Sequence, residues 1–452
     1  MAILASILRS SSKNVPLIEI SKSNEVEPII ILDWYSEARK RLFVSKGAQK
    51  ADSFGMNFKP REGDNFIKPT RTCGGCWITT DRSFEKTAKA IIIDNTHFPS
   101  APLDMPRNTN RPNDQYWFFW ARESGTKGWN KIEEFVQDRS IKDSKEDPGE
   151  GIYDQAYNYT TAYRRDSDIP YHPELNDVII RFRYSNGKLD IDDETYMKNI
   201  LENKFPNSDD SIAYATWIVS NCGSTIGARA RIDYAKELRD AGLKFDGYGH
   251  CFEDEEFMKK LPTQFDNSDI GRGLTWKTVI KKTSKYRFYF AFENGIHCRD
   301  YLSEKFWRNA LEAELVPIVF GVHPDDIKAL APPHSYIHTE DYENPKDLID
   351  YLEYLVKNDT AYMEYHSWRL FKPDLTKAGE IWEDKRNCGI CKLMQKNMKE
   401  NYPVRMIKSV ASWWWLNSHD NKCLNLTSSD IPKYFDDIVP PVSMENNWFD
   451  EL

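Results

Sequence analysis

Three groups of charged side chains stand at positions where they could act together. Glu304 and Lys305 open an expected helix, Arg229 lies in the first turn of another, and Glu123 follows an apolar run that ends at Trp120. An arginine early in a helix opposes the helix dipole unless an anion is bound there. A carboxylate can take the proton of an attacking hydroxyl group. These residue types together suit group transfer from a phosphate-bearing substrate, but position alone favours a solvated surface role for each of them.

The elements that must position these side chains alternate in the second part of the chain. Helices are expected at about 228–242 and 304–315 and from 344, and apolar runs predict strands at 212–220, 244–248, 286–292 and 316–320. Such alternation is typical of a parallel sheet that helices cover on both faces. Ligands bind beyond the carboxyl ends of the strands in these sheets. The residues after Ser220, Tyr248 and Phe292 are therefore candidates for a binding site.

The first part of the chain has a less regular pattern. Short apolar runs predict strands at 28–32, 90–93, 116–120 and 178–182. From these changes in texture we expect an irregular lead-in over 1–25, an α/β domain over 26–208, a second α/β domain over 209–393, and an extension of uncertain packing over 394–452. The run Trp413-Trp414-Trp415 in that extension fits either core packing or a glycan-facing surface.

Composition narrows the class of protein. Lys and Arg number 61 against 70 Asp and Glu, and this acidic balance lacks the broad basic face that nucleic-acid binding needs. Eight cysteines and three N-x-Ser/Thr triplets, at Asn158, Asn358 and Asn425, favour a secretory, oxidising compartment. No segment reaches the roughly 18–20 apolar residues of a membrane helix. We expect any membrane attachment to come through an anchor that this chain does not show.

One long segment carries a resemblance to a known family. The run FYFAFENGIHCRDYLSEKFWRNALEAELVPIVFG, residues 288–321, resembles the donor-binding signature of the alpha-1,3-fucosyltransferases. The stretches at 217–251 and 158–171 (NYTTAYRRDSDIPY) are similar to that family as well, and the likeness runs from about Leu32 to Leu393. It implies an α/β fold of the GT-B-like kind, with two facing Rossmann-like domains. The C-terminal domain is then a doubly wound parallel sheet that holds the donor.

The resemblance also implies roles for individual residues. Arg229 and Lys305 are expected on the diphosphate of GDP-fucose, and Glu123 is expected to be the catalytic base, although Arg122 stands where the family has an aromatic residue. Glu304 is expected to act in catalysis near the sugar. The further residues implied for the donor pocket are Tyr248, Gly249, Tyr289, Glu293 and Asn294.

The implied activity is an inverting transfer of L-fucose from GDP-fucose to an N-acetylglucosamine of a glycan or glycoprotein, of N-glycan core or N-acetyllactosamine type. A different nucleotide sugar on the same scaffold, or a catalytically silent glycan-binding protein, stays open. Golgi residence follows from the family. No permanently bound cofactor and no required metal are expected, although Asp166-Ser167-Asp168 and Asp190-Ile191-Asp192 have the spacing of a metal motif.

The cysteines acquire partners through the same resemblance. It implies that Cys388 and Cys391 bond to two N-terminal cysteines, Cys76 and, with less usual spacing, Cys73. Cys222 and Cys251 flank one strand–helix–strand unit and are expected to pair. A four-thiolate zinc site is the alternative for the two Cys-x-x-Cys pairs. The remaining two, Cys298 and Cys423, have no assigned partner.

Overall fold

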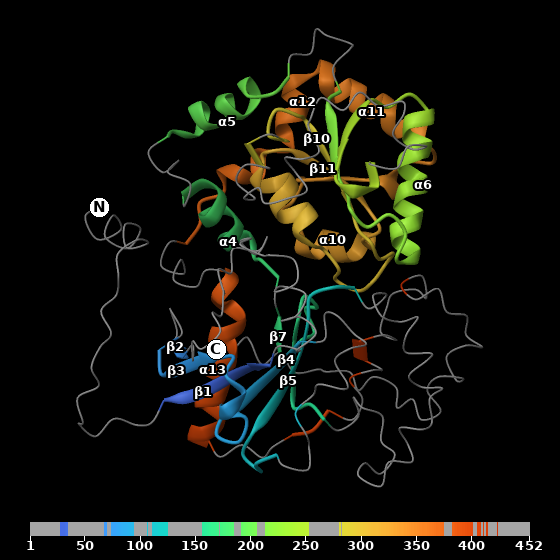
Figure 1. The fold of residues 1–452 in the computed structure, drawn as a ribbon. Coiled ribbons are helices and arrows are strands. Elements are labelled where there is room, and N and C mark those ends of the chain that lie inside the picture. The colour runs from blue at the N-terminus through green and yellow to red at the C-terminus, as the bar shows by residue number, and fades with distance from the viewer. Residues whose placement is uncertain are drawn as a thin grey trace.

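The chain forms two α/β halves, one above the other in Figure 1. The computed structural model describes residues 28–34, 67–69, 74–94, 106, 111–124, 156–170, 172–184, 191–205, 213–252, 280–281, 283–374, 382–400, 405–407, 410, 413–414 and 423. Among these residues, no helix combines the length and the apolar character that crossing a bilayer requires. The expected lead-in over 1–25 lies outside them.

The second half contains a five-stranded sheet in the order β12-β11-β10-β8-β9, with every pair parallel. Its strands are β8 (Ala215–Ile218), β9 (Phe245–Tyr248), β10 (Phe288–Phe292), β11 (Val316–Phe320) and β12 (Ile337–His338). The first four confirm the strands predicted for this region. Helices connect β8 to β9, β10 to β11 and β11 to β12, as parallel neighbours require.

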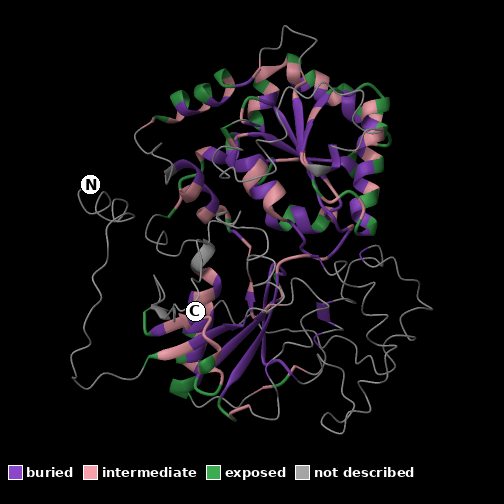
Figure 2. Cartoon of the chain, viewed as in Figure 1, coloured by how far each residue is buried: buried purple, intermediate pink, exposed green. Residues whose placement is uncertain are grey.

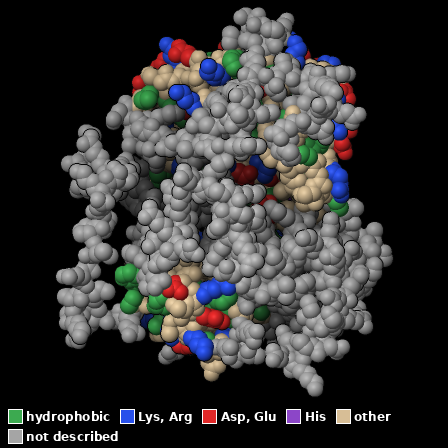
Figure 3. Space-filling view, viewed as in Figure 1, with side chains coloured by type: hydrophobic (Ala, Val, Ile, Leu, Met, Phe, Trp, Pro, Cys, Tyr) green, Lys and Arg blue, Asp and Glu red, His purple; other side chains and the backbone are tan. Residues whose placement is uncertain are grey.

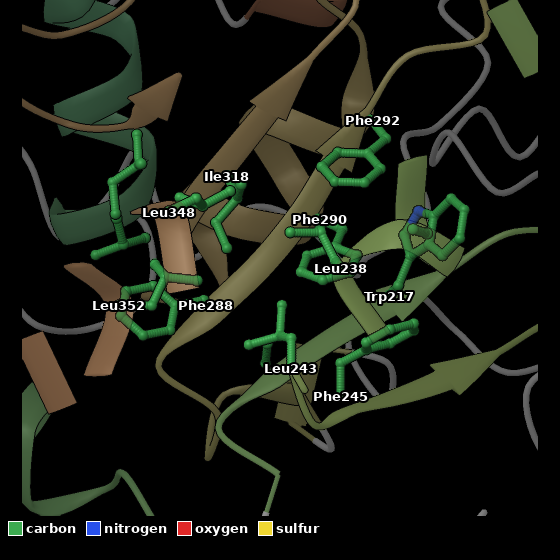
Figure 4. Close-up of a cluster of buried hydrophobic side chains, with 14 of the residues drawn as sticks. Trp217, Leu238, Leu243, Phe245, Phe288, Phe290, Phe292, Ile318, Leu348 and Leu352 are labelled. Carbon is green, nitrogen blue, oxygen red and sulfur yellow. The ribbon is translucent and has the colours of Figure 1, made fainter. Parts of the chain in front are cut away.

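Both faces of this sheet are buried because β10 is apolar at every position. Phe288, Phe290 and Phe292 point to one face, where Trp217 and the helices α6 (Ile226–Asp240) and α11 (Pro345–Lys357) cover them (Figure 4). Tyr289 and Ala291 point to the other face, against η7 (Lys305–Glu312) and α10 (Pro324–Leu330). Helices on both faces make this half the doubly wound domain that the sequence predicts.

Local sequence sets the ends of these helices. Thr225 caps α6, its side chain accepting from the Ala228 N–H, and Gly242 ends the helix with a positive φ of 108°. Asn344 caps α11 ahead of Pro345. Further short elements of this half are η6 (His250–Phe252), η8 (Thr339–Asp341), α12 (Asp359–Glu364) and η9 (Ser367–Leu370).

The first half contains a seven-stranded sheet in the order β2-β3-β1-β4-β5-β6-β7, parallel except for the pair β2 and β3. Its strands are β1 (Ile29–Trp34), β2 (Ile67–Pro69), β3 (Cys76–Thr79), β4 (Ala90–Asp94), β5 (Tyr116–Ala121), β6 (Tyr159–Ala162) and β7 (Ile169–Pro170), and the short helix η1 (Arg82–Phe84) follows β3. Two sheets of this kind give the GT-B-like fold. Figure 2 shows both sheets buried, with exposed residues on the outer sides of the helices.

The C-terminal part of the chain returns to the first sheet. Helix α13 (Trp382–Glu400) buries Ile390 and Met394 against one face of it. On the other face, Trp413 and Trp414 pack with Phe119 and belong to the core. For these two tryptophans the structure favours core packing over a glycan-facing surface, whereas Trp415 lies outside the described residues.

One predicted strand is wrong. Residues 178–182 lie in helix α4 (Leu175–Ile179) and in the helical segment η5 (Ile180–Tyr184) that continues it. The backbone N–H of Glu174 donates to Asp177 Oδ2 at 3.4 Å, which stabilises the helix start. An apolar run this short fits a strand or a helix equally well. Val178, Ile179 and Phe182 share one helix face and bury it against the second half. Helix α5 (Asp193–Glu202) follows and packs on α12.

Three disulfides join segments across the chain: Cys76–Cys391, Cys222–Cys251 and Cys298–Cys423. The first two agree with the pairing that the resemblance implies. Because Cys76 and Cys391 are bonded to each other, neither thiol can ligate zinc in this state. Cys388 is buried on α13, and its expected partner Cys73 lies outside the described residues.

Candidate active site

The first turn of α6 is docked on the turn that follows β10. Thr225 Oγ1 donates to the Asn294 carbonyl at 2.6 Å. A Cβ at Gly227 would lie 2.7 Å from the same carbonyl oxygen, so a residue with a side chain could not pack this closely. Arg229 is exposed on this turn, and its Nη1 donates to the Gly223 carbonyl at 3.2 Å. The helix N-terminus and its arginine therefore lie at the carboxyl edge of the second sheet.

Arg231, two residues further on, is buried and braces this edge from behind. Its Nη1 donates to the Phe292 carbonyl at 2.9 Å and its Nη2 to the Asn221 carbonyl at 2.8 Å. It thereby links the ends of β8 and β10. Burial lowers the pKa of Arg231 from its ordinary value, partly offset by the carboxylates of Glu293 and Glu304. The spacing of the two arginines does not reveal which one is buried.

Glu293 is fully buried and holds Lys305 in place. Its carboxylate accepts from the Ser303 N–H at 2.8 Å, from Ser303 Oγ at 2.9 Å and from Lys305 Nζ at 2.9 Å. Lys305 Nζ also contacts Ser303 Oγ at 2.7 Å and Glu304 Oε1 at 3.4 Å. The expectation that Glu293 lines the sugar pocket needs correction, because these three hydrogen bonds commit its carboxylate to the protein.

The lysine and its neighbouring carboxylate are both charged. Burial would lower the pKa of Lys305, but Glu293 and Glu304 outweigh it and raise the pKa above the ordinary value. Burial would raise the pKa of Glu304, but Lys305 and then Arg308 outweigh it and lower the pKa to about 2. At neutral pH this edge of the sheet thus carries an ionised lysine held between two carboxylates.

Glu123 reaches this edge from the opposite half. It follows β5, and its Oε2 accepts from Asn294 Nδ2 at 3.4 Å and from the Tyr301 hydroxyl at 3.5 Å. Ser124 Oγ contacts Asn294 Oδ1 at 3.5 Å. Arg122 lies over the Trp120 ring, 4.7 Å from its centroid. The structure therefore brings Glu123 of the first half together with Asn294 and Tyr301 of the second.

Tyr301 is a site residue that the sequence reasoning missed. It is buried, and its pKa lies well above the ordinary value, first because of burial and then because the carboxylates of Glu123, Glu293 and Glu304 oppose its ionisation. These carboxylates come from both halves of the chain, so the tyrosine marks the point where they converge. Its place inside the family signature is the only signal in the sequence.

Two expected pocket residues lie in the interior instead. Tyr248 is buried, and its hydroxyl hydrogen-bonds the Tyr286 hydroxyl at 2.8 Å. Tyr289 is fully buried on the η7 face of the sheet and accepts from Asn309 Nδ2 at 3.0 Å. Both side chains therefore pack inside the second half. Gly249 lies at the end of β9 with a φ of 99°, and a Cβ there would clash with the Val219 carbonyl.

The glycosylation candidates fare differently. Asn158 is fully buried; its side chain accepts from the Trp117 N–H at 2.6 Å and donates to the Arg405 carbonyl at 2.6 Å. A glycan has no room there, so this expectation is wrong. Asn358 caps α12 and is partly exposed, and Asn425 lies outside the described residues.

The aspartates of the Asp166-Ser167-Asp168 motif bind other protein groups. Asp166 pairs with Arg164, and Asp168 accepts from the Thr160 N–H at 2.7 Å. Asp190 lies outside the described residues. Within the described part of the chain, no group of three or more His, Cys, Asp or Glu is arranged to hold a metal ion.

On the face shown in Figure 3, acidic and basic side chains lie in a hollow between the two halves.

Both halves match family models. The model for the C-terminal part of glycosyltransferase family 10 (fucosyltransferase) matches residues 210–413, and the model for the N-terminal part of fucosyltransferases matches residues 28–172. Crystal structures of an alpha1,3-fucosyltransferase also align, one with GDP at 13% identity, a TM-score of 0.42, and coverage of 85% of this chain and 95% of that one. A TM-score this low does not by itself establish a shared fold.

Curated relatives agree with the family models. The chain is 30% identical over 355 residues to human 4-galactosyl-N-acetylglucosaminide 3-alpha-L-fucosyltransferase FUT5, covering 75% of this chain and 72% of that one. It is 27% identical over 353 residues to the Drosophila melanogaster glycoprotein 3-alpha-L-fucosyltransferase A, covering 78% of this chain but only 56% of the fly protein. The chain therefore belongs to glycosyltransferase family 10, the fucosyltransferases.

Proposed function

We propose that this glycosyltransferase moves L-fucose from GDP-fucose to an N-acetylglucosamine of a glycan, with inversion at the fucose anomeric carbon. The observation that carries the proposal is the contact between Glu123 of the first half and Asn294 of the second, at 3.4 Å. It sets a carboxylate opposite the edge that bears Arg229 and Lys305. The names of the relatives, which are alpha-L-fucosyltransferases, support fucose as the transferred sugar.

On the donor side, Arg229 and Lys305 hold the diphosphate. Lys305 Nζ makes its longest contact with Glu304, at 3.4 Å, and a phosphate oxygen can replace that carboxylate more readily than it can replace Glu293. Each charge-assisted hydrogen bond of this kind contributes roughly 1.5–3 kcal/mol. Glu304, ionised and released from the lysine, then stands beside the sugar, where a carboxylate stabilises developing positive charge.

On the acceptor side, Glu123 takes the proton of the attacking hydroxyl group. A general base typically raises the rate of such a reaction 10²–10⁴-fold. Because the base and the cations that receive the leaving GDP come from opposite halves, the hydroxyl attacks the face of the sugar away from the leaving group. Attack from that face inverts the anomeric centre.

The two cations can neutralise the leaving diphosphate, so we propose that no metal ion is needed. Three disulfides fit an oxidising compartment such as the Golgi lumen, where a glycan or glycoprotein acceptor is present.

A donor panel tests the proposal. The protein is incubated with EDTA, a glycan array and GDP-fucose, GDP-mannose or a UDP-sugar in turn, and nucleotide release and product linkage are measured. We expect transfer from GDP-fucose alone, to N-acetylglucosamine in alpha linkage. Transfer only from another nucleotide sugar would remove the fucose assignment. Glycan binding without nucleotide release would indicate the silent glycan-binding alternative.

A further inference from the structure

One arginine of the first half reaches across to two aspartates of the second. Arg165 follows β6, and its backbone N–H donates to Asp300 Oδ2 at 2.9 Å. Its Nε donates to Asp300 Oδ1 at 2.7 Å, and its Nη2 to Asp326 Oδ1 at 3.2 Å. No sequence pattern assigns a role to this residue. It makes three hydrogen bonds from one half to the other.

The two aspartates shape the loop that carries the site. Asp300 has a positive φ of 58°, and its own N–H donates to Asp326 Oδ2 at 2.8 Å. Both carboxylates are buried, so each needs a cation or a donor close by. Arg165 supplies donors to both at once, because Nε and Nη2 of one planar guanidinium point to different carboxylates. The left-handed turn at Asp300 is thus stabilised from the other half of the protein.

Arg165 is itself held in place on its own side. The neighbouring Arg164 is buried, donates to Asp166 from Nε at 2.8 Å and from Nη2 at 2.6 Å, and lies over the Trp413 ring at 4.5 Å. The backbone at this point is therefore tied to the core of the first half. Tyr301, which follows Asp300 directly, hydrogen-bonds Glu123 at 3.5 Å.

We propose that Arg165 is a positioning residue for the transfer reaction, which holds the Asp300 turn so that Tyr301 and Asn294 orient the Glu123 carboxylate. The inference rests on the proposed function of Glu123 as the base. In this proposal, the hydrogen bonds of Arg165 with Asp300 and Asp326 align the two halves close to Glu123. A mere structural brace would also contain these hydrogen bonds, so the test must separate positioning from stability.

The test compares Arg165→Ala and Arg165→Lys with a control, Arg239→Ala, which removes an arginine paired with its neighbour Asp240 at the far end of α6. We expect Arg165→Ala to lower kcat about 10–100-fold while the Kd for GDP changes less than twofold, because the donor cations all lie on the second half. Arg165→Lys keeps a cation beside the two buried carboxylates and should recover part of kcat. Arg239→Ala should leave both values unchanged.

A double-mutant cycle with Glu123→Gln decides whether the effect passes through the base. In that background, Arg165→Ala should lower kcat less than threefold further, since there is no base left to position. An equal loss in both backgrounds, unchanged transfer by Arg165→Ala, or a parallel fall in kcat and GDP affinity would overturn the inference. Hydrogen exchange across 293–303 should rise in Arg165→Ala alone, and an unchanged exchange rate would also count against it. If the wild-type chain transfers no fucose, the proposed function fails, whereas the exchange result still reports on the Asp300 turn.

Discussion

The two halves of this protein reach the same architecture by different routes. In the second half, the helices that cover the sheet follow their strands closely in the chain, as α6 follows β8. In the first half, α13 and the Trp413–Trp414 segment cover the sheet from more than two hundred residues away. The second half is thus a local structure that neighbouring residues specify, and the first half depends on long-range closure. The chemistry that we propose is divided in the same way, with the cations on the second half and the base on the first.

The largest effect should come from the side that supplies the base. Glu123→Gln keeps the size of the side chain and its contacts near Asn294 but cannot accept a proton. We expect kcat to fall roughly 10²–10⁴-fold, as for loss of a general base, with the Kd for GDP unchanged. Steady-state kinetics and calorimetric GDP titration measure the two values. A variant that loses GDP affinity as well would show that the division between the halves is wrong.

Removing one disulfide from each half should lower the melting temperature by different amounts. Cys222–Cys251 spans 29 residues, for which loop closure predicts roughly 3–4 kcal/mol, whereas Cys76–Cys391 spans 315 and the same model gives about 6 kcal/mol. Cys391→Ser should therefore lower the melting temperature more than Cys251→Ser. Differential scanning calorimetry under non-reducing conditions gives the comparison. An equal shift in both variants would mean that the length of the closed loop does not set the size of the effect.

Within the donor half, the two cations should separate binding from stability. Arg229→Ala and Lys305→Ala should each weaken GDP binding by roughly 1.5–3 kcal/mol, since each removes a charge-assisted hydrogen bond. Only Lys305→Ala should also lower the melting temperature, because it leaves the buried Glu293 carboxylate without its cation. Isothermal titration and thermal unfolding provide both readouts. Destabilisation by Arg229→Ala would contradict its exposed position.

The smallest effect that we expect is on the stability of the protein at acidic pH, through Glu304 beside Lys305. The folded pKa of Glu304, about 2, lies below its ordinary 4.5, so the stabilisation is fully present above pH 4.5 and is lost as the pH falls towards 2. Glu304→Gln should remove a pH-dependent contribution of order 1–3 kcal/mol in that window. Urea unfolding at several pH values measures it, with Glu237→Gln on the exposed side of α6 as the control. An unchanged pH profile would show that the carboxylate is not coupled to Lys305.

Much of the second half can be predicted from its residues alone. Its strands are continuous apolar runs, α6 has a capping threonine and a terminal glycine, and both signals act between residues close in the chain. Arg229 and Lys305 each lie in the first turn of the helix that follows such a strand. The wrong strand at 178–182 has a physical reason as well. Five apolar and basic residues carry no decisive period, and the face that they bury belongs to the other half.

The sequence by itself made Glu123, Arg229, Glu304 and Lys305 candidates for chemistry, and it did so mainly through the resemblance to the fucosyltransferases, because residue type and position alone also fit surface positions. Only the tertiary structure decided how these side chains are used. It turned Glu293 inward to hold Lys305, buried Tyr248 and Tyr289, and brought Tyr301 to Glu123 and Arg165 to Asp300. These outcomes depend on how two sheets face each other across the chain. Contacts between residues so far apart leave no periodic trace in the sequence.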